Sequence, residues 1–141
     1  MQPYTKSQNI ALLLLRLITA VIFLYAAYAK LPLWYFEPDG ISATLANIMK
    51  LLTIVEPLGA LAIAFGFLTR LAASGLSIIM VGAIWVSQFV MQIGFATPTG
   101  AGWNFSLVVL AGCIVLMAFG AGEWSVDARW RRDDISSNEK R

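Results

Sequence analysis

Apolar and polar positions alternate in long blocks along this 141-residue chain. Four apolar stretches occupy residues 10–29, 51–68, 71–95 and 104–120, and prolines, glycines and polar residues separate them. An apolar helix of about 20 residues crosses a hydrocarbon core of roughly 30 Å, so each stretch meets or approaches the length of a membrane span. The pattern predicts an all-α integral membrane protein whose four transmembrane helices form a compact antiparallel bundle. We expect one domain over residues 1–132 and a polar cytoplasmic tail over residues 133–141.

The connection between the first two spans, residues 31–50, allows two interpretations. Ser42 is a typical helix N-cap, and the apolar residues that follow it recur at helical spacing. Either a short interfacial helix occupies this external loop, or the same residues extend the second span into one long helix kinked at Pro57. The sequence leaves both open.

Composition supports a membrane protein and narrows the chemistry. Hydrophobic residues make up 59% of the chain and charged residues 13%, which is too little polar surface for a water-soluble domain of this size. One cysteine and no histidine exclude an internal disulfide, a Cys-x-x-Cys redox pair, His-ligated haem and the usual zinc sites. We therefore expect no metal and no covalent cofactor, so that redox chemistry would need a borrowed, lipid-soluble cofactor such as a quinone.

The basic residues set an orientation. Most of them fall with the termini and the Thr69-Arg70 turn, whereas Lys30 and Lys50 fall on the opposite side. The positive-inside rule then places both termini in the cytoplasm and predicts a multi-pass protein of the cytoplasmic membrane, with Trp34 among the interfacial anchors outside. The net charge of +2 forms no basic face, so we expect contacts with membrane lipid and none with nucleic acid.

Glu56 is the first functional candidate, because it lies at the entrance of the second span. An ionisable side chain in hydrocarbon costs about 2.5–3.5 kcal/mol on insertion scales, so it faces the protein interior, pairs with another group or loses its charge. Glu56 could be protonated and act as a catalytic proton donor or acceptor, or be ionised and paired with Lys30. The structural alternative is a hydrogen bond that only holds helices together.

Other polar and aromatic residues fall at the depth of Glu56 when about 1.5 Å is counted for each helical residue. We expect Gln88 and Gln92, one helical turn apart, to join Lys30 and Asn104 around Glu56 in an outer-leaflet pocket. Three aromatic residues at the same level complete the predicted ligand-binding set: Tyr25, Tyr28 and Trp85. The amides could equally join helices, the tyrosines could be interfacial anchors, and Trp85 could be a packing residue.

A second polar group, Arg16, Arg70 and Asp127, falls near the cytoplasmic side and has a structural explanation. The long side chain of Arg16 could reach lipid phosphates, or the carboxylates of Asp127 and Glu123. We do not expect an ion pair between Arg16 and Glu56, because roughly 10 Å or more of depth would separate them.

Four motifs together carry a resemblance to a known family. They are Leu13-Leu-Leu-Arg-Leu17, Tyr28-Ala-Lys30-Leu31, Val55-Glu56-Pro-Leu-Gly59 continued by Gly66-Phe-Leu-Thr-Arg70, and Gly122-Glu-Trp-Ser-Val-Asp127. The chain resembles the DoxX family of small four-helix proteins of the bacterial inner membrane. Related DoxD-type proteins are subunits of a thiosulfate:quinone oxidoreductase, and some DoxX proteins are linked to redox-stress complexes with a superoxide dismutase and a sulfurtransferase. Where many relatives carry His-Gly, this chain has Tyr25-Ala-Ala-Tyr28.

These observations support three hypotheses. In the first, the protein binds a quinone-like ligand near Glu56 as part of a membrane redox system; if it is an enzyme, it is then a quinone-linked oxidoreductase subunit. In the second, it is a non-catalytic membrane anchor or assembly subunit for a redox-protein partner, or a homo-oligomer. A small-solute permease is the third, and four short helices leave it little room for alternating access.

Overall fold

The computed structural model describes residues 4–36, 40–98 and 100–130, and the predicted tail at 133–141 lies outside them. The regular secondary structure of this part of the chain is helical except for one minimal antiparallel strand pair, which confirms the all-α prediction. The elements are α1 (Lys6–Lys30), the 3₁₀ helix η1 (Leu31–Trp34), α2 (Ala43–Phe65), α3 (Thr69–Trp85), the π-helix η2 (Val86–Val90), β1 (Ala96–Thr97), β2 (Gly100–Ala101) and α4 (Trp103–Phe119).

Three of the helical segments are long and apolar enough to cross a membrane. They are Lys6–Trp34, Ala43–Phe65 and Thr69–Val90. The fourth, α4, is apolar but has only 17 residues, which at about 1.5 Å per residue falls just short of a hydrocarbon core.

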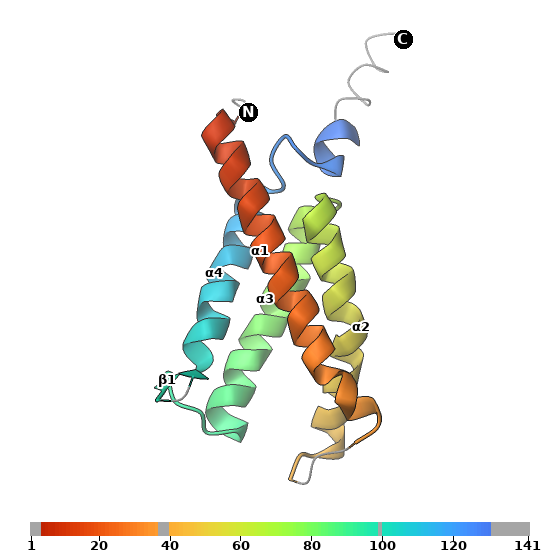
Figure 1. Cartoon of the computed structure of the whole chain (residues 1–141), viewed down its shortest axis with the longest axis vertical. Coiled ribbons are helices and arrows are strands. Elements are labelled where there is room, and N and C mark those ends of the chain that lie inside the picture. Colours follow the sequence, from red (N-terminus) through yellow and green to blue (C-terminus); the bar gives the residue numbers. More distant parts are fainter. Residues whose placement is uncertain (1–3, 37–39, 99, 131–141) are drawn as a thin grey trace.

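The helices run in alternating directions, so that the start of α1, the α2–α3 turn and the segment after α4 lie at one end (Figure 1). At the other end lie η1 and the β1–β2 pair (Figure 1). The main contacts join α1 to α2 and α3 to α4, and smaller ones join α2 to α3 and α1 to α4. Phe23, Ile63, Leu76, Cys113 and Leu116 are fully buried between the helices.

The α2 helix decides between the two interpretations of residues 31–50. Ser42 caps α2 by accepting a hydrogen bond from the backbone N–H of Leu45 at 3.3 Å, as its residue type predicts. The helix then continues through Pro57 to Phe65, so the separate interfacial helix is wrong. A break would create two new helix ends with unpaired backbone groups, whereas Pro57 removes one N–H donor only.

The third span ends earlier than the prediction of residues 71–95. After Trp85 the chain forms the π-helical turn of η2, and Gln92 adopts a left-handed conformation at φ 52°. Wide-turn hydrogen bonds from Met91 N to Val86 O (2.9 Å) and from Ile93 N to Ser87 O (2.8 Å) close this end. Gln88 and Gln92 therefore do not form the predicted pair on one α-helical face.

Candidate functional site

Glu56 and Lys30 form an ion pair between the middle of α2 and the last residue of α1. The Lys30 ammonium donates to Oε2 of Glu56 at 2.7 Å and to Oε1 at 2.9 Å. Its third bond goes to the carbonyl of Ala26 at 3.2 Å, so all three ammonium donors are used. The side chain of Glu56 is 1% exposed and that of Lys30 is 24% exposed. This geometry matches the paired alternative for Glu56, and the lysine is the member that reaches the surface.

The local sequence explains why the carboxylate is enclosed. Glu56 lies on the buried stripe of α2 with Thr53, Ala60 and Ile63, so its side chain faces the other helices. Gly59, one turn further on, has the side chain of Leu76 3.0 Å from the place where a Cβ would lie. The missing side chain thus admits α3 close beside α2, as small residues do in membrane proteins.

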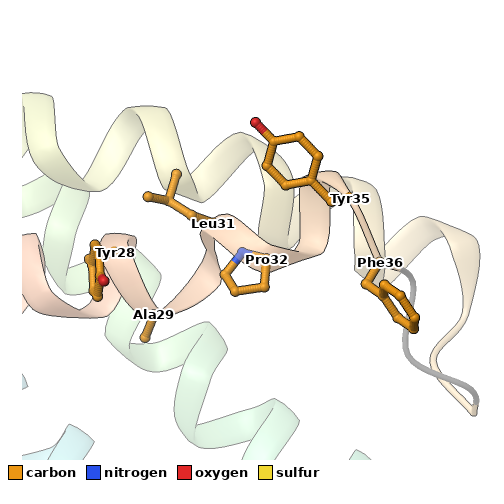
Figure 2. Close-up of a pocket in the computed structure, with 6 residues that line it drawn as sticks. All are labelled: Tyr28, Ala29, Leu31, Pro32, Tyr35 and Phe36. Carbon is orange, nitrogen blue, oxygen red and sulfur yellow. The ribbon is translucent and has the colours of Figure 1, made fainter.

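A shallow groove of about 450 Å³ lies along the end of α1 and η1, next to Lys30 in the chain (Figure 2). Carbon atoms dominate its surface, and aromatic rings stand at both ends. Its lining residues are Tyr28, Ala29, Leu31, Pro32, Tyr35 and Phe36. Of the residues predicted to bind a ligand, Tyr28 alone lines this groove.

Within the described ranges, the remaining predicted residues form no hydrogen bond with Glu56, whose carboxylate is bound by Lys30. Gln88, Gln92 and Trp85 are exposed, as is Tyr25, and none of them lines the groove. Asn104 is partly buried; its Oδ1 is enclosed and has no hydrogen-bond partner within the described ranges. The pocket of Glu56 with the two glutamines and Asn104 therefore stays a prediction. A turn that closes with i→i+5 bonds shifts the side chains after Val86 out of α-helical register, and no pattern of residue types revealed this shift.

A hydrogen-bond chain that the sequence analysis missed ties η1 to α2. The indole Nε1 of Trp34 donates to Oγ1 of Thr53 at 2.9 Å, and this hydroxyl donates to the carbonyl of Lys50 at 2.7 Å. The sequence did contain one indication of a polar contact here, because Thr53 lies one helical turn before Glu56 on the same stripe of α2. It could not identify Trp34 as the partner, because tryptophan at this depth is also the usual interfacial anchor.

At the opposite end, Arg16 is 1% exposed and bonds only to backbone carbonyls in the part of the chain that the structure describes. Its Nε donates to Ile63 O (2.9 Å) and its Nη2 to Ala64 O (2.7 Å). Its Nη1 donates to Ala121 O and Trp124 O, both at 2.9 Å. Backbone carbonyls thus take the place of the lipid phosphates or carboxylates that we expected as partners of Arg16. They are available because the last carbonyls of a helix such as α2 lack intrahelical partners.

Asp127 caps the start of α3 at the same end of the molecule, by accepting hydrogen bonds from backbone N–H groups. Its Oδ1 accepts from the N–H of Leu68 at 2.7 Å and its Oδ2 from the N–H of Thr69 at 3.0 Å, while its own N–H donates to Gly66 O at 2.9 Å. A carboxylate at a helix N-terminus is also favoured by the helix dipole. Arg16 and Asp127 thus serve the two sides of the α2–α3 turn.

Two further contacts close this end of the molecule. Asn9 exchanges hydrogen bonds with Glu123, through Nδ2 to Oε2 at 3.1 Å and from the Glu123 N–H to Oδ1 at 2.9 Å. Arg70 donates to Ala118 O at 3.2 Å. The polar groups here bind each other and the backbone, which indicates a structural role. The candidate functional site is therefore the end that holds Lys30 and Glu56.

Comparison with known protein families gives a match. The family model described as DoxX matches residues 11–89, which is more than half of the chain. The matched range includes Arg16, Lys30 and Glu56, whereas Asp127 follows it. No curated protein and no solved structure matches.

Proposed function

The chain belongs to the DoxX family of membrane proteins, and on this premise we propose that it binds a lipophilic, quinone-like ligand in the groove beside Lys30 as part of a membrane redox system. The observation that carries the proposal is the placement of the ion pair. A carboxylate shut away from solvent is joined to a partly exposed ammonium, and the residues on either side of Lys30 in the chain line an apolar, aromatic groove. In this proposal four helices span the bacterial inner membrane with both termini in the cytoplasm, so that the groove faces the outer leaflet.

The groove suits the shape and polarity of a quinone head. Its volume of about 450 Å³ falls within the range of small-molecule sites. The faces of Tyr28, Tyr35 and Phe36 can pack against a flat ring, and aromatic contacts of this kind add about 0.5–1.5 kcal/mol beyond area burial. The two tyrosine hydroxyls supply donors for carbonyl oxygens, while Ala29 and Pro32 leave room for the ring.

The ion pair supplies the proton chemistry. A quinone that takes up two electrons becomes a quinol by binding two protons, and the electrons must come from a redox-protein partner. Lys30 is the group through which a proton can pass between the buried carboxylate and the surface, because it touches Glu56 and is itself partly exposed. A ligand carbonyl that accepts a hydrogen bond from Lys30 must displace one of the three that the ammonium already makes.

Titration of a short-chain quinone against the purified protein tests this function. Wild type should bind saturably, and Glu56→Gln should bind at least about 10-fold more weakly, a difference of about 1.4 kcal/mol. The substitution keeps the shape of the side chain but leaves the Lys30 ammonium without its counter-charge. Glu123→Gln at the opposite end is the matched control and should bind like wild type. Equal binding by wild type and Glu56→Gln would remove the proposal.

An alternative function, membrane anchor or assembly subunit, has an observation of its own. Gly75 and Gly82 lie seven residues apart on an outward face of α3, and a side chain added at either would meet no atom within 4 Å. Ile78 between them is 74% exposed. Small residues let membrane helices approach closely, so a partner helix could dock here. A partner protein should then co-purify with wild type in gentle detergent and should be lost from Gly82→Leu. Purification of wild type without any partner would count against this alternative.

A further inference from the structure

The contact between Trp34 and Thr53 is unusual for a tryptophan at a membrane interface. Such a residue normally directs its ring N–H toward the headgroup region. Trp34 is 51% exposed, yet its N–H is bound to Thr53, a side chain that is 8% exposed. The donor is thus directed into the protein while much of the ring stays at the surface. A merely anchoring tryptophan would not need this bond.

The position of this contact relates it to the ion pair. Thr53 lies one helical turn before Glu56, and both are on the buried stripe of α2. Lys30 ends α1, and η1 begins at the next residue, Leu31. The backbone of Lys30 is therefore held on one side by α1 and on the other by η1. Fixing Trp34 to Thr53 fixes the segment that presents Lys30 to the carboxylate.

The same segment forms a wall of the groove. Leu31 and Pro32 belong to η1 and line it directly, while Tyr35 and Phe36 follow immediately after Trp34 (Figure 2). A movement of η1 away from α2 would change the groove and would also pull on Lys30, the residue that directly precedes η1. The Thr53 hydroxyl opposes such a movement from its own fixed position, because it is held by Lys50 O within α2.

We propose that Trp34 and Thr53 are positioning residues. Their hydrogen bond, called the clasp below, holds η1 against α2, keeps Lys30 in contact with Glu56 and limits access to the buried carboxylate. A neutral hydrogen bond contributes only about 0.5–1.5 kcal/mol net, so the clasp can open and close without unfolding the helices. The proposal concerns the same site as the proposed function and rests on it only where ligand affinity is concerned. Access to the carboxylate is a property of the protein alone.

Labelling with dicyclohexylcarbodiimide tests the clasp without any quinone. This apolar reagent modifies carboxyl groups that it can reach within a membrane, and mass spectrometry measures the rate at Glu56. Trp34→Phe keeps an aromatic ring and removes the donor, and Thr53→Val keeps the shape and removes the hydroxyl. Each should label Glu56 about 2- to 10-fold faster than wild type, the factor that corresponds to one neutral hydrogen bond.

The double variant and two controls distinguish loss of this one hydrogen bond from a general loosening of the helix packing. Trp34→Phe with Thr53→Val should label no faster than either single variant, because both remove the same bond. Thr53→Ser retains the hydroxyl and should label like wild type, as should Trp124→Phe at the opposite end. Unchanged labelling in both single variants, or a double variant whose rate is the product of the two increases, would overturn the clasp.

Failure of this inference is distinguishable from failure of the proposed function. If wild type binds no quinone but the labelling pattern holds, the clasp stands and the ligand proposal fails. If quinone binds and labelling is the same in all variants, the ligand proposal stands and the clasp fails.

Discussion

The ammonium of Lys30 lies 2.7 Å from Oε2 of Glu56, and the two members of the pair differ sharply in exposure, 24% against 1%. The lysine can turn its charged end to the surface if its partner is lost, because a long side chain can extend along apolar surface. The carboxylate of Glu56 is buried and has a short side chain, so it cannot reach the surface in the same way. The pair is therefore asymmetric in energy as well as in position.

Removal of the lysine should accordingly destabilise the protein more than removal of the acid charge. Lys30→Met leaves an uncompensated buried carboxylate, and losing one partner of a buried pair costs about 3–5 kcal/mol. Glu56→Gln should cost less, and the double variant should be close to Glu56→Gln alone. Thermal unfolding in detergent measures the three differences. Equal losses for the two single variants would contradict the asymmetry.

Gly66 should be far less tolerant of alanine than Gly75. Gly66 ends α2 at φ 69°, and a Cβ there would lie 2.5 Å from Cβ of Ser125 and 2.7 Å from Nη2 of Arg16. Left-handed backbone alone costs a residue with a side chain about 1–2 kcal/mol, so we expect Gly66→Ala to lose about 2 kcal/mol or more. Gly75→Ala meets nothing within 4 Å and should be neutral or slightly stabilising in the same unfolding measurement. Similar stability of the two variants would show that the turn is not packed as described.

Arg16→Lys should not be a conservative change. The guanidinium presents a planar fork that serves carbonyls of two separate segments, whereas an ammonium presents its donors from one point. Each buried carbonyl left without a partner costs about 1–3 kcal/mol, and we expect a total loss of about 2–4 kcal/mol. Arg70→Lys is the control, since Arg70 makes one exposed bond at 3.2 Å, and it should lose less than about 1 kcal/mol. A neutral Arg16→Lys would rule out the carbonyl network as a major source of stability.

Asp127→Asn should loosen the start of α3 locally. The amide keeps one acceptor oxygen, so it cannot serve both Leu68 and Thr69, and it also loses the charge that complements the helix dipole. A loss of about 1–2 kcal/mol is expected. Hydrogen exchange should become faster at the amides of Leu68 and Thr69 while those in the middle of α1 are unchanged. Unchanged exchange at both amides would mean that Asp127 is not the cap.

The sequence predicted the features that follow from the cost of placing polar groups among apolar ones. It placed Glu56 in the interior and Lys30 within reach, and it separated Arg16 from Glu56 by depth. Ser42 as the cap of α2 followed from residue type and spacing. The apolar stretches located the helices to within a few residues, apart from the start of α2 and the end of the third span.

The features that the sequence could not supply depend on backbone geometry. The partners of Arg16 are carbonyls, which every residue has, so no residue type identified them. The π-helical turn at Val86 and the left-handed Gln92 take the two amides off a shared α-helical face, and nothing in the chemistry of the amides required it. The groove lies along the end of α1 and η1, where the helix narrows to a 3₁₀ turn that the apolar pattern did not indicate.

The most direct test of the central claim is to fill the groove without touching the ion pair. Ala29 lines the groove and is exposed, so Ala29→Trp adds bulk there and leaves the buried core unchanged. Val21→Trp, at a position on α1 that is 64% exposed and outside the groove, is the control. In a titration of a short-chain quinone against protein in lipid nanodiscs, wild type and Val21→Trp should bind saturably with the same affinity, and Ala29→Trp should bind at least about 10-fold more weakly. Equal affinity for Ala29→Trp and wild type, or no saturable binding by wild type, would contradict the claim that this groove holds the ligand.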